Sequence, residues 1–167
     1  MPLPLYSMLA KNYPTNHNTI EVLKKVGGGA IGLPNSCVIR VSQALNYAGE
    51  IHKIKKSHIM DTVTGADGLL YGKKVMEFKD YLNHYYKSTP RVAVRSPVKM
   101  NPNQFKLKKG IIGFFIDGWD NARGHFTLWD GFRLAYEGDH NYWSEFHKGY
   151  IRGQVCIEEI CLWECPY

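Results

Sequence analysis

The sequence predicts an α+β fold in which helices are packed on an antiparallel sheet. Segments with helical spacing of apolar residues fill the first half of the chain. Short apolar runs typical of strands follow in the second half, and a turn-rich connection joins two of them as in a hairpin. Helices followed by strands favour an α+β domain with its helices on one face of the sheet.

Two helical segments are predicted in the helical part of the chain, one near its beginning and one near its end. Residues 18–26 have apolar spacing suited to a short helix. This helix should end at the glycine run 27–29, where we expect a flexible loop with no regular element. Residues 74–87 repeat the helical pattern, and we expect the aromatic residues along one side of this segment to lie in the core.

A third helix is predicted over residues 38–48, and it carries the functional argument. Apolar residues at 38, 41, 44, 45 and 48 form a stripe that faces the core. Asn35 or Ser36 suits the N-cap, and Gly49 suits the C-terminal stop. Cys37 therefore lies in the first turn of a buried helix.

The strands are predicted after residue 90. The prolines of residues 90–109 indicate irregular or edge structure. Residues 111–116 form a continuous apolar run typical of a buried strand. The turn-rich segment 117–124 then leads to a second strand over residues 125–130, which predicts an antiparallel hairpin. Residues 154–163 add a further strand.

Composition bounds the domain organisation and the partners. A chain of 167 residues with 44% hydrophobic and 22% charged residues suits one globular domain, 1–167. No apolar run approaches the ~18 residues that cross a bilayer, and the N-terminus does not resemble a Sec signal peptide. The net charge of +6 comes from lysines scattered along the chain. We therefore expect neither nucleic-acid binding nor membrane insertion.

The cysteines divide into a lone residue and a C-terminal group. Cys37 stands alone, whereas Cys156, Cys161 and Cys165 lie near the C-terminus. This group lacks a C-x-x-C pair and neighbouring histidines, so we expect no structural zinc site. One local disulfide or free buried thiols would both fit.

Cys37 has the position of a catalytic nucleophile. The unpaired N–H groups and the positive dipole end of a helix N-terminus stabilise a thiolate and lower its pKa. The same N–H groups can bind the oxyanion that forms when a carbonyl is attacked. A cysteine packed as a small apolar residue is the alternative interpretation of this position.

A thiol nucleophile requires a general base, and His125 is the best placed of the seven histidines. It opens a predicted strand, which gives the ring a rigid support, and it follows Gly124, which lets another backbone or a substrate approach closely. An acidic group should orient the imidazole. Asp130 lies five residues further along the same strand and should point to the opposite face, which leaves Glu137 and Asp139.

Aromatic residues near the predicted site have two interpretations. Tyr142, Trp143 and the Trp119-Asp120 turn either line a substrate groove or pack in the core. Large aromatic side chains dominate buried surface, so packing explains them at least as well.

Four blocks of sequence carry a resemblance to a known family. They are Asn35–Gly49 (NSCVIRVSQALNYAG), Thr64–Asp67 (TGAD), Lys108–Ile112 (KKGII) and Asn121–Gly131 (NARGHFTLWDG). With these blocks, in this order, the chain resembles the fourth family of type VI secretion amidase effectors. The first and last blocks are the specific ones.

The resemblance implies a papain-like fold of the NlpC type, with the nucleophile at a helix N-terminus. It also implies a cysteine peptidase that needs no cofactor and cleaves the bond between γ-D-glutamate and meso-diaminopimelate in the peptidoglycan stem. Cys37 would be the nucleophile, His125 the base and Asp139 the acid. Asp139 takes this role only if a short insertion precedes it, because the ungapped position falls on Tyr136; Glu137 ranks behind Asp139.

The resemblance further implies delivery by the type VI secretion apparatus into the periplasm of a target bacterium, without a Sec signal peptide. A cognate immunity protein would inhibit the enzyme in the producing cell. Two alternatives stay open. One is a cysteine acyltransferase or deamidase of the same fold, which shares the acyl-enzyme chemistry. The other, less favoured, is a non-catalytic basic protein that binds cell-wall polymer or nucleic acid.

Overall fold

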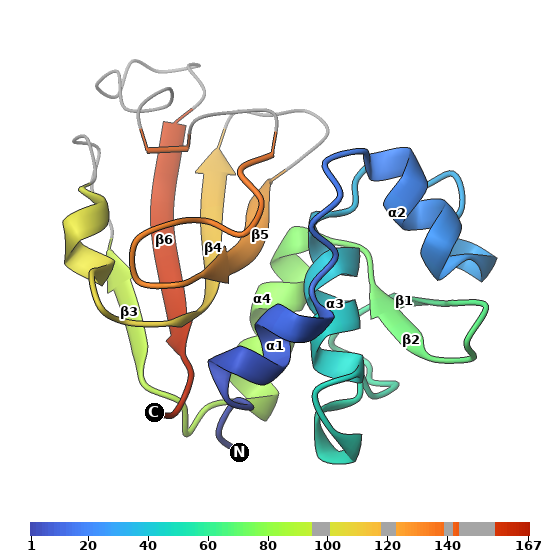
Figure 1. The fold of residues 1–167 in the computed structure, drawn as a ribbon, viewed down its shortest axis with the longest axis horizontal. Helices are drawn as coiled ribbons and strands as arrows, with labels where there is room; N and C mark the ends of the chain where they lie inside the picture. The colour runs from blue at the N-terminus through green and yellow to red at the C-terminus, as the bar shows by residue number, and fades with distance from the viewer. Residues whose placement is uncertain (95–100, 118–122, 139–141, 144–155) are drawn as a thin grey trace.

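A group of helices and an antiparallel sheet lie side by side in the molecule (Figure 1). The computed structural model describes residues 1–94, 101–117, 123–138, 142–143 and 156–167. Helices come mainly from the first half of the chain, and the strands of the larger sheet come from the second half. The predicted α+β class is therefore confirmed.

The helices follow the apolar periodicity of the sequence. The α-helices of the described residues are α1 (Tyr6–Asn12), α2 (Thr19–Val26), α3 (Cys37–Asn46) and α4 (Val75–Tyr85). The helices predicted over 18–26, 38–48 and 74–87 are thus confirmed, whereas α1 was not predicted. The Asn18 side chain accepts a hydrogen bond from the Glu21 N–H and caps α2.

Two details at helix ends differ from the expectation. The glycine run contains a short 3₁₀-helix, η1 (Gly28–Ala30), where no regular element was expected. Positive φ angles at Gly27 and Gly28 turn the chain there. A Cβ on Gly28 would lie 2.4 Å from the Thr64 carbonyl oxygen, so this turn also brings two backbones together. α3 is capped by Tyr47, and Gly49 lies beyond its end.

The larger sheet contains strands from the second half of the chain. Its order is β3 (Arg91–Val94), β6 (Cys156–Glu164), β4 (Gly110–Asp117) and β5 (Gly124–Trp129), with all neighbours antiparallel. The predicted β4–β5 hairpin and the C-terminal strand are confirmed. β3 lies at the sheet edge, and η3 (Pro102–Phe105) is a short 3₁₀-helix, as the proline-rich segment indicated.

A second, two-stranded sheet was not predicted. It pairs β1 (Thr62–Thr64) with β2 (Leu70–Gly72) in antiparallel register. β2 contacts α3, so this hairpin lies on the helical side of the molecule (Figure 1). Another short 3₁₀-helix, η2 (Glu50–His52), follows α3.

The sheet is buried on both faces, which explains the continuous apolar run of β4. Ile111 and Phe115 face the main core, which they share with α1, α3 and α4. Ile112 and Phe114 face a second apolar cluster, which includes Tyr142. The expectation that helices cover one face of the sheet is correct, but the opposite face is also buried, in the second apolar cluster.

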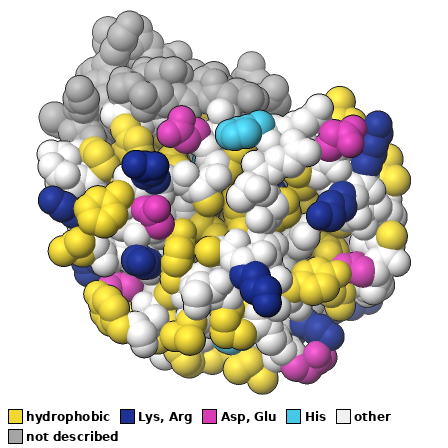
Figure 2. Space-filling view, viewed as in Figure 1, with side chains coloured by type: hydrophobic (Ala, Val, Ile, Leu, Met, Phe, Trp, Pro, Cys, Tyr) yellow, Lys and Arg dark blue, Asp and Glu magenta, His cyan; other side chains and the backbone are white. Residues whose placement is uncertain are grey.

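The surface and the cysteines add further findings. Lys and Arg side chains lie apart from one another on the face that Figure 2 shows. The four cysteines are free thiols. In the described part of the chain, no helix is long and apolar enough to cross a bilayer, and no group of His, Cys, Asp and Glu could hold a metal ion.

Candidate active site

Cys37 is the first residue of α3, as the sequence predicts. Ser36 precedes it as the N-cap, but the Ser36 hydroxyl makes no capping bond to the helix backbone. The first bond of the helix runs from the Arg40 N–H to the Ser36 carbonyl, at 2.8 Å. The N–H groups ahead of it have no partner within the helix and are available to an anion.

The Cys37 thiol is largely buried between α3 and β5, with 9% of the residue exposed. Burial raises the pKa of this thiol, and this effect outweighs three groups that lower the pKa. Those groups are the N–H of Phe126, the N–H groups at the start of α3 and the charge of Arg40. The expected lowering by the helix N-terminus is therefore present, but desolvation exceeds it.

His125 is the second residue of β5 and pairs with Phe114 on β4. It directly precedes Phe126, whose N–H acts on the Cys37 thiol. The two predicted residues therefore lie at adjoining points of α3 and β5. The Gly124 prediction is also confirmed, because a Cβ there would lie 1.9 Å from the Phe114 carbonyl oxygen of β4.

The His125 ring is held by several contacts. Its Nε2 atom lies 3.1 Å from the Tyr136 carbonyl oxygen. Its face stacks on Tyr142, with ring centroids 4.7 Å apart. Gly138 lies against another edge, since a Cβ there would come within 3.1 Å of the ring atom Cε1. These contacts leave little freedom for the ring to turn.

Tyr136 is held in place by a residue that the sequence reasoning missed. The Tyr136 N–H donates to the Thr127 Oγ1 at 3.0 Å, and the same hydroxyl lies 3.1 Å from the Tyr13 hydroxyl. Thr127 lies two residues after His125 on β5, so both side chains point to the same face. That period of two was the available signal for Thr127.

The acidic candidates have different positions. Asp139 lies outside the described residues, so its role stays a prediction. Glu137 is exposed. Asp130 accepts from the N–H groups of Phe132 and Arg133, both at 2.7 Å, and closes the turn after β5, so it does not serve His125. The exclusion of Asp130 is therefore confirmed, although Asp130 follows the last residue of β5 and does not belong to the strand as expected.

The aromatic candidates pack in the core. Tyr142 stacks on His125 and on Phe114, and Trp143 contacts Phe105, Phe114 and Trp129. Both belong to the cluster on the far face of the sheet. Trp119 and Asp120 lie outside the described residues.

A groove of about 650 Å³ passes over Cys37. One wall comes from the segment before α3 and from the start of α4, and Arg123 and Gly124 contribute from the approach to β5. Three cations and one carboxylate are among its lining residues: Lys73, Lys74, Arg123 and Glu77. In the described part of its lining, the groove therefore combines the thiol with more cations than carboxylates.

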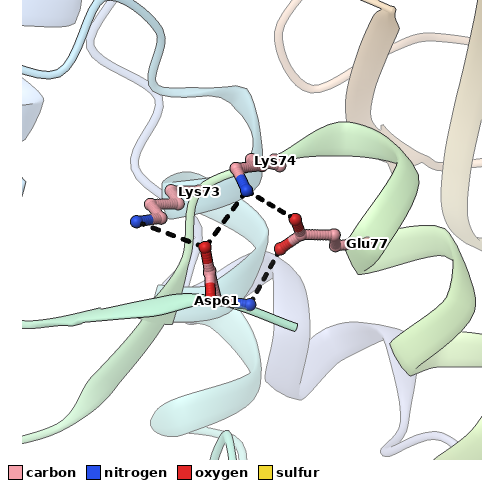
Figure 3. A network of polar contacts seen from close by, with 4 residues as sticks. All are labelled: Asp61, Lys73, Lys74 and Glu77. Atoms are coloured by element: carbon pink, nitrogen blue, oxygen red, sulfur yellow. Dashed lines mark hydrogen bonds and ion pairs between the residues drawn. The ribbon is translucent and has the colours of Figure 1, made fainter. Parts of the chain in front are cut away.

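Ion pairs organise one wall of this groove (Figure 3). Lys74 lies between two carboxylates, with its Nζ 3.1 Å from Asp61 and 2.7 Å from Glu77. Lys73 approaches the same Asp61 carboxylate at 3.7 Å. Glu77 also accepts from the Asp61 N–H at 2.8 Å. Lys74 is therefore held by this network, whereas Lys73 has a single, longer contact.

A thiol and an imidazole at adjoining backbone positions, with helix N–H groups beside the thiol, can perform nucleophilic acyl chemistry. The comparisons give the class of the protein as an amidase effector. The family model of type VI secretion system (T6SS), amidase effector protein 4 (Tae4), matches residues 33–163 and so includes both Cys37 and His125. The chain belongs to the Tae4 family of amidase effectors, and the resemblance found in the sequence is confirmed.

Solved structures support the assignment over the whole chain. The type VI effector–immunity complex Tae4–Tai4 from Enterobacter cloacae gives a TM-score of 0.78 at 26% identity, covering 98% of this chain and 99% of that one. Tae4 from Salmonella typhimurium, in complex with the Enterobacter cloacae immunity protein Tai4, gives 0.78 at 29% identity with the same coverage. The Tae4–Tai4 complex from Salmonella Typhimurium gives 0.75 at 30% identity, also covering 98% and 99%. No curated protein matches the chain.

Proposed function

We propose that this chain is a cysteine amidase that hydrolyses the γ-D-glutamyl–meso-diaminopimelate bond of peptidoglycan stem peptides. Residues 1–167 would act as one papain-like domain of the NlpC type. The observation that carries the proposal is the position of the Cys37 thiol. It lies in a groove at a helix N-terminus and beside the backbone of Phe126, the residue that directly follows His125. Membership of an amidase effector family supports the reaction class.

The protonation of His125 follows from its contact with Tyr136. A carbonyl oxygen can only accept, so Nε2 carries the hydrogen and donates it. In the neutral ring Nδ1 then carries the lone pair. His125 is thereby prepared to act as a base through Nδ1.

The reaction begins when His125 takes the thiol proton and the Cys37 sulfur attacks the carbonyl carbon of the stem peptide. The N–H groups at the start of α3 bind the oxyanion of the tetrahedral intermediate. The imidazolium then gives its proton to the leaving amine, and a thioester remains on Cys37. Water, deprotonated by His125, attacks the thioester, releases the new carboxylate and restores the thiol.

Asp139 completes the proposed catalytic set. It directly follows Gly138, whose backbone lies against the His125 ring. A carboxylate at this point of the chain would stabilise the imidazolium that forms during both half-reactions. Glu137 is the weaker candidate because its side chain is exposed.

The charge of the groove suits this substrate. A stem peptide carries free carboxylates close to the bond that is cut. Among the described residues that line the groove are three cations, Lys73, Lys74 and Arg123, and one carboxylate, Glu77. Opposite charges across the groove would orient the stem and raise its local concentration.

The biological setting follows from the family. We propose that the type VI secretion apparatus delivers the enzyme into the periplasm of a target bacterium, where it acts as an antibacterial toxin. We also propose a cognate immunity protein as its inhibitor in the producing cell. The Tae4 structures from Enterobacter cloacae and Salmonella Typhimurium, in complex with Tai4, support this partner.

Purified protein and its Cys37→Ala and His125→Ala variants, incubated with isolated peptidoglycan, provide the test. We expect wild type to release peptides that begin with meso-diaminopimelate and to leave stems that end in D-glutamate on the glycan, both identified by mass spectrometry. Both variants should lose this activity. A parallel reaction with an added primary amine distinguishes the amidase from the alternative acyltransferase. An amide product would indicate acyl transfer, and no product from folded wild type would reject the amidase.

A further inference from the structure

Arg40 is a buried cation one helical turn after the nucleophile, with 0% of its surface exposed. Its Nε donates to the Ser36 hydroxyl at 2.9 Å. Its Nη1 donates to the carbonyls of Pro14 at 2.8 Å and Asn16 at 2.6 Å. Among the described residues its acceptors are neutral oxygens, and Nη2 has no hydrogen-bond partner. A buried charge without a carboxylate partner is costly, so its presence beside the candidate site requires an explanation.

The same guanidinium reaches the other half of the candidate site. Its central carbon lies 3.9 Å from the centre of the Tyr136 ring, which gives a close cation–π stack. The Tyr136 carbonyl is the group that meets His125 Nε2 at 3.1 Å. Arg40 therefore contacts the residue before Cys37 and the residue that orients His125.

We propose that Arg40 is a positioning residue, whose guanidinium fixes the Ser36–Cys37 turn and the Tyr136 carbonyl in one rigid arrangement. This role rests on the proposed amidase function. The nucleophile belongs to a helix and the base to a strand, so their separation depends on groups that contact both sides. Arg40 is such a group because its planar donors point in fixed directions.

The charge of Arg40 adds a second effect. Arg40 lowers the pKa of the Cys37 thiol, against the larger opposing effect of burial. Tyr13 also interacts electrostatically with Cys37, but burial raises the pKa of Tyr13 far above its ordinary value, so this phenol is neutral at physiological pH. Arg40 is thus the permanent positive charge that acts on the thiol, and it favours the thiolate needed for attack.

Three variants separate geometry from charge. Arg40→Lys keeps the charge but loses the planar donors, and Arg40→Met loses both. Ser36→Ala leaves Arg40 in place but removes the acceptor of its Nε, together with the contact between the Ser36 and Thr19 hydroxyls. Lys25→Met is the matched control, because it removes one exposed positive charge from α2. Circular dichroism and thermal melting establish which variants fold.

We then compare two measurements that a purely structural role of Arg40 would leave unchanged in a folded variant. They are the kinetic constants kcat and KM, and the pH midpoint of Cys37 alkylation. On a purified stem peptide, we expect Arg40→Lys to lower kcat by about 10- to 100-fold with KM within about twofold of wild type, and Ser36→Ala to lower kcat less. For alkylation of Cys37 by iodoacetamide, followed by peptide mass mapping, we expect the pH midpoint to rise in Arg40→Met, because the charge that lowers the pKa of the thiol is lost. Lys25→Met should match wild type in both.

A folded Arg40→Lys variant with wild-type kcat would overturn the positioning role, and Arg40→Met with an unchanged alkylation midpoint would overturn the charge effect on Cys37. If Arg40→Met does not fold, Arg40→Lys and Ser36→Ala decide the question. Alkylation requires no substrate. Failure of the amidase proposal would therefore appear as wild-type protein without hydrolysis. Failure of the Arg40 proposal would appear as active wild-type protein with an Arg40→Lys variant of equal kcat, or as an Arg40→Met variant whose Cys37 is alkylated as in wild type.

Discussion

The Tyr136 carbonyl oxygen lies 3.1 Å from Nε2 of His125. By the family resemblance, Tyr136 occupies the position of the catalytic acid when no insertion is allowed, and it contacts His125 through its backbone. A tyrosine side chain cannot replace a carboxylate there. A backbone carbonyl can nevertheless hold an imidazole in one tautomer and orientation. The orientation of His125 therefore depends on how firmly the backbone of Tyr136 is held in place.

Thr127→Val tests the support of that segment. The change removes the hydroxyl that accepts from the Tyr136 N–H and contacts the Tyr13 hydroxyl. A buried N–H without a partner destabilises the fold, so the free energy of unfolding should fall by about 2 kcal/mol. We expect kcat to fall about tenfold or more, because the carbonyl that orients His125 shifts. Urea unfolding and steady-state kinetics measure the two effects.

Thr127→Ser is the matched comparison, because it keeps the hydroxyl and loses only a methyl group. It should recover most of the kcat that Thr127→Val loses. Equal kcat values for the serine and valine variants would show that the hydroxyl does not support catalysis.

Asp139→Asn tests the acid predicted from the sequence. The Tyr136 carbonyl already holds the tautomer of His125, so losing the carboxylate should remove only its stabilisation of the imidazolium. We expect kcat to fall by about 10- to 100-fold, less than the ~10⁴-fold loss seen where the acid alone holds the tautomer. Glu137→Gln, which changes an exposed side chain, should leave kcat within about twofold of wild type. A larger loss in Glu137→Gln than in Asp139→Asn would reverse the assignment.

The sequence predicts α3 and the β4–β5 hairpin because their apolar patterns are long and regular. The same elements carry Cys37 and His125, so the places of these two proposed site residues in the fold could be predicted as well. β1 and β2 were missed because each has three residues, which is too short to show a period. α1, with seven residues, is similarly short.

The supporting residues were missed for a different reason. Arg40 acts through Tyr136, which is distant in sequence, and only tertiary packing brings the two together. An arginine within the apolar run of α3 was the available signal for a buried cation. The raised pKa of Cys37 was also missed, because the helix N-terminus can be read from sequence whereas the burial that opposes it cannot.

Alkaline pH should destabilise the fold through Cys161 and Cys165. Burial raises the pKa of both thiols from 9.0 to about 12. Below pH 9 both thiols are protonated in the folded and the unfolded chain. Between about pH 9 and 12 the unfolded chain loses these protons first, so the free energy of unfolding falls as pH rises. The loss is at most about 1.4 kcal/mol per pH unit for each thiol.

A Cys161→Ala/Cys165→Ala variant isolates this effect. It should be less stable at pH 8, because two buried side chains become smaller, but its stability should fall less steeply above pH 9. The buried tyrosines titrate in both proteins and cancel in the comparison. Urea unfolding at a series of pH values measures both slopes, and parallel curves would contradict the prediction.

Lys73→Met tests the electrostatic role of the groove. Lys73 approaches Asp61 at 3.7 Å, whereas Lys74 is held by two carboxylates at shorter distances, so Lys73 is the lysine better placed to meet a substrate carboxylate (Figure 3). Removing its charge should raise KM for a stem peptide about three- to tenfold and leave kcat nearly unchanged, because binding is lost equally in ground and transition state. The difference from wild type should shrink at high salt, since screening weakens the same interaction. Lys25→Met removes a charge outside the groove and should leave KM unaltered at every salt concentration. If both lysine variants change KM alike, the attraction comes from the net charge of the protein, and the groove has no specific role in recognising the carboxylate.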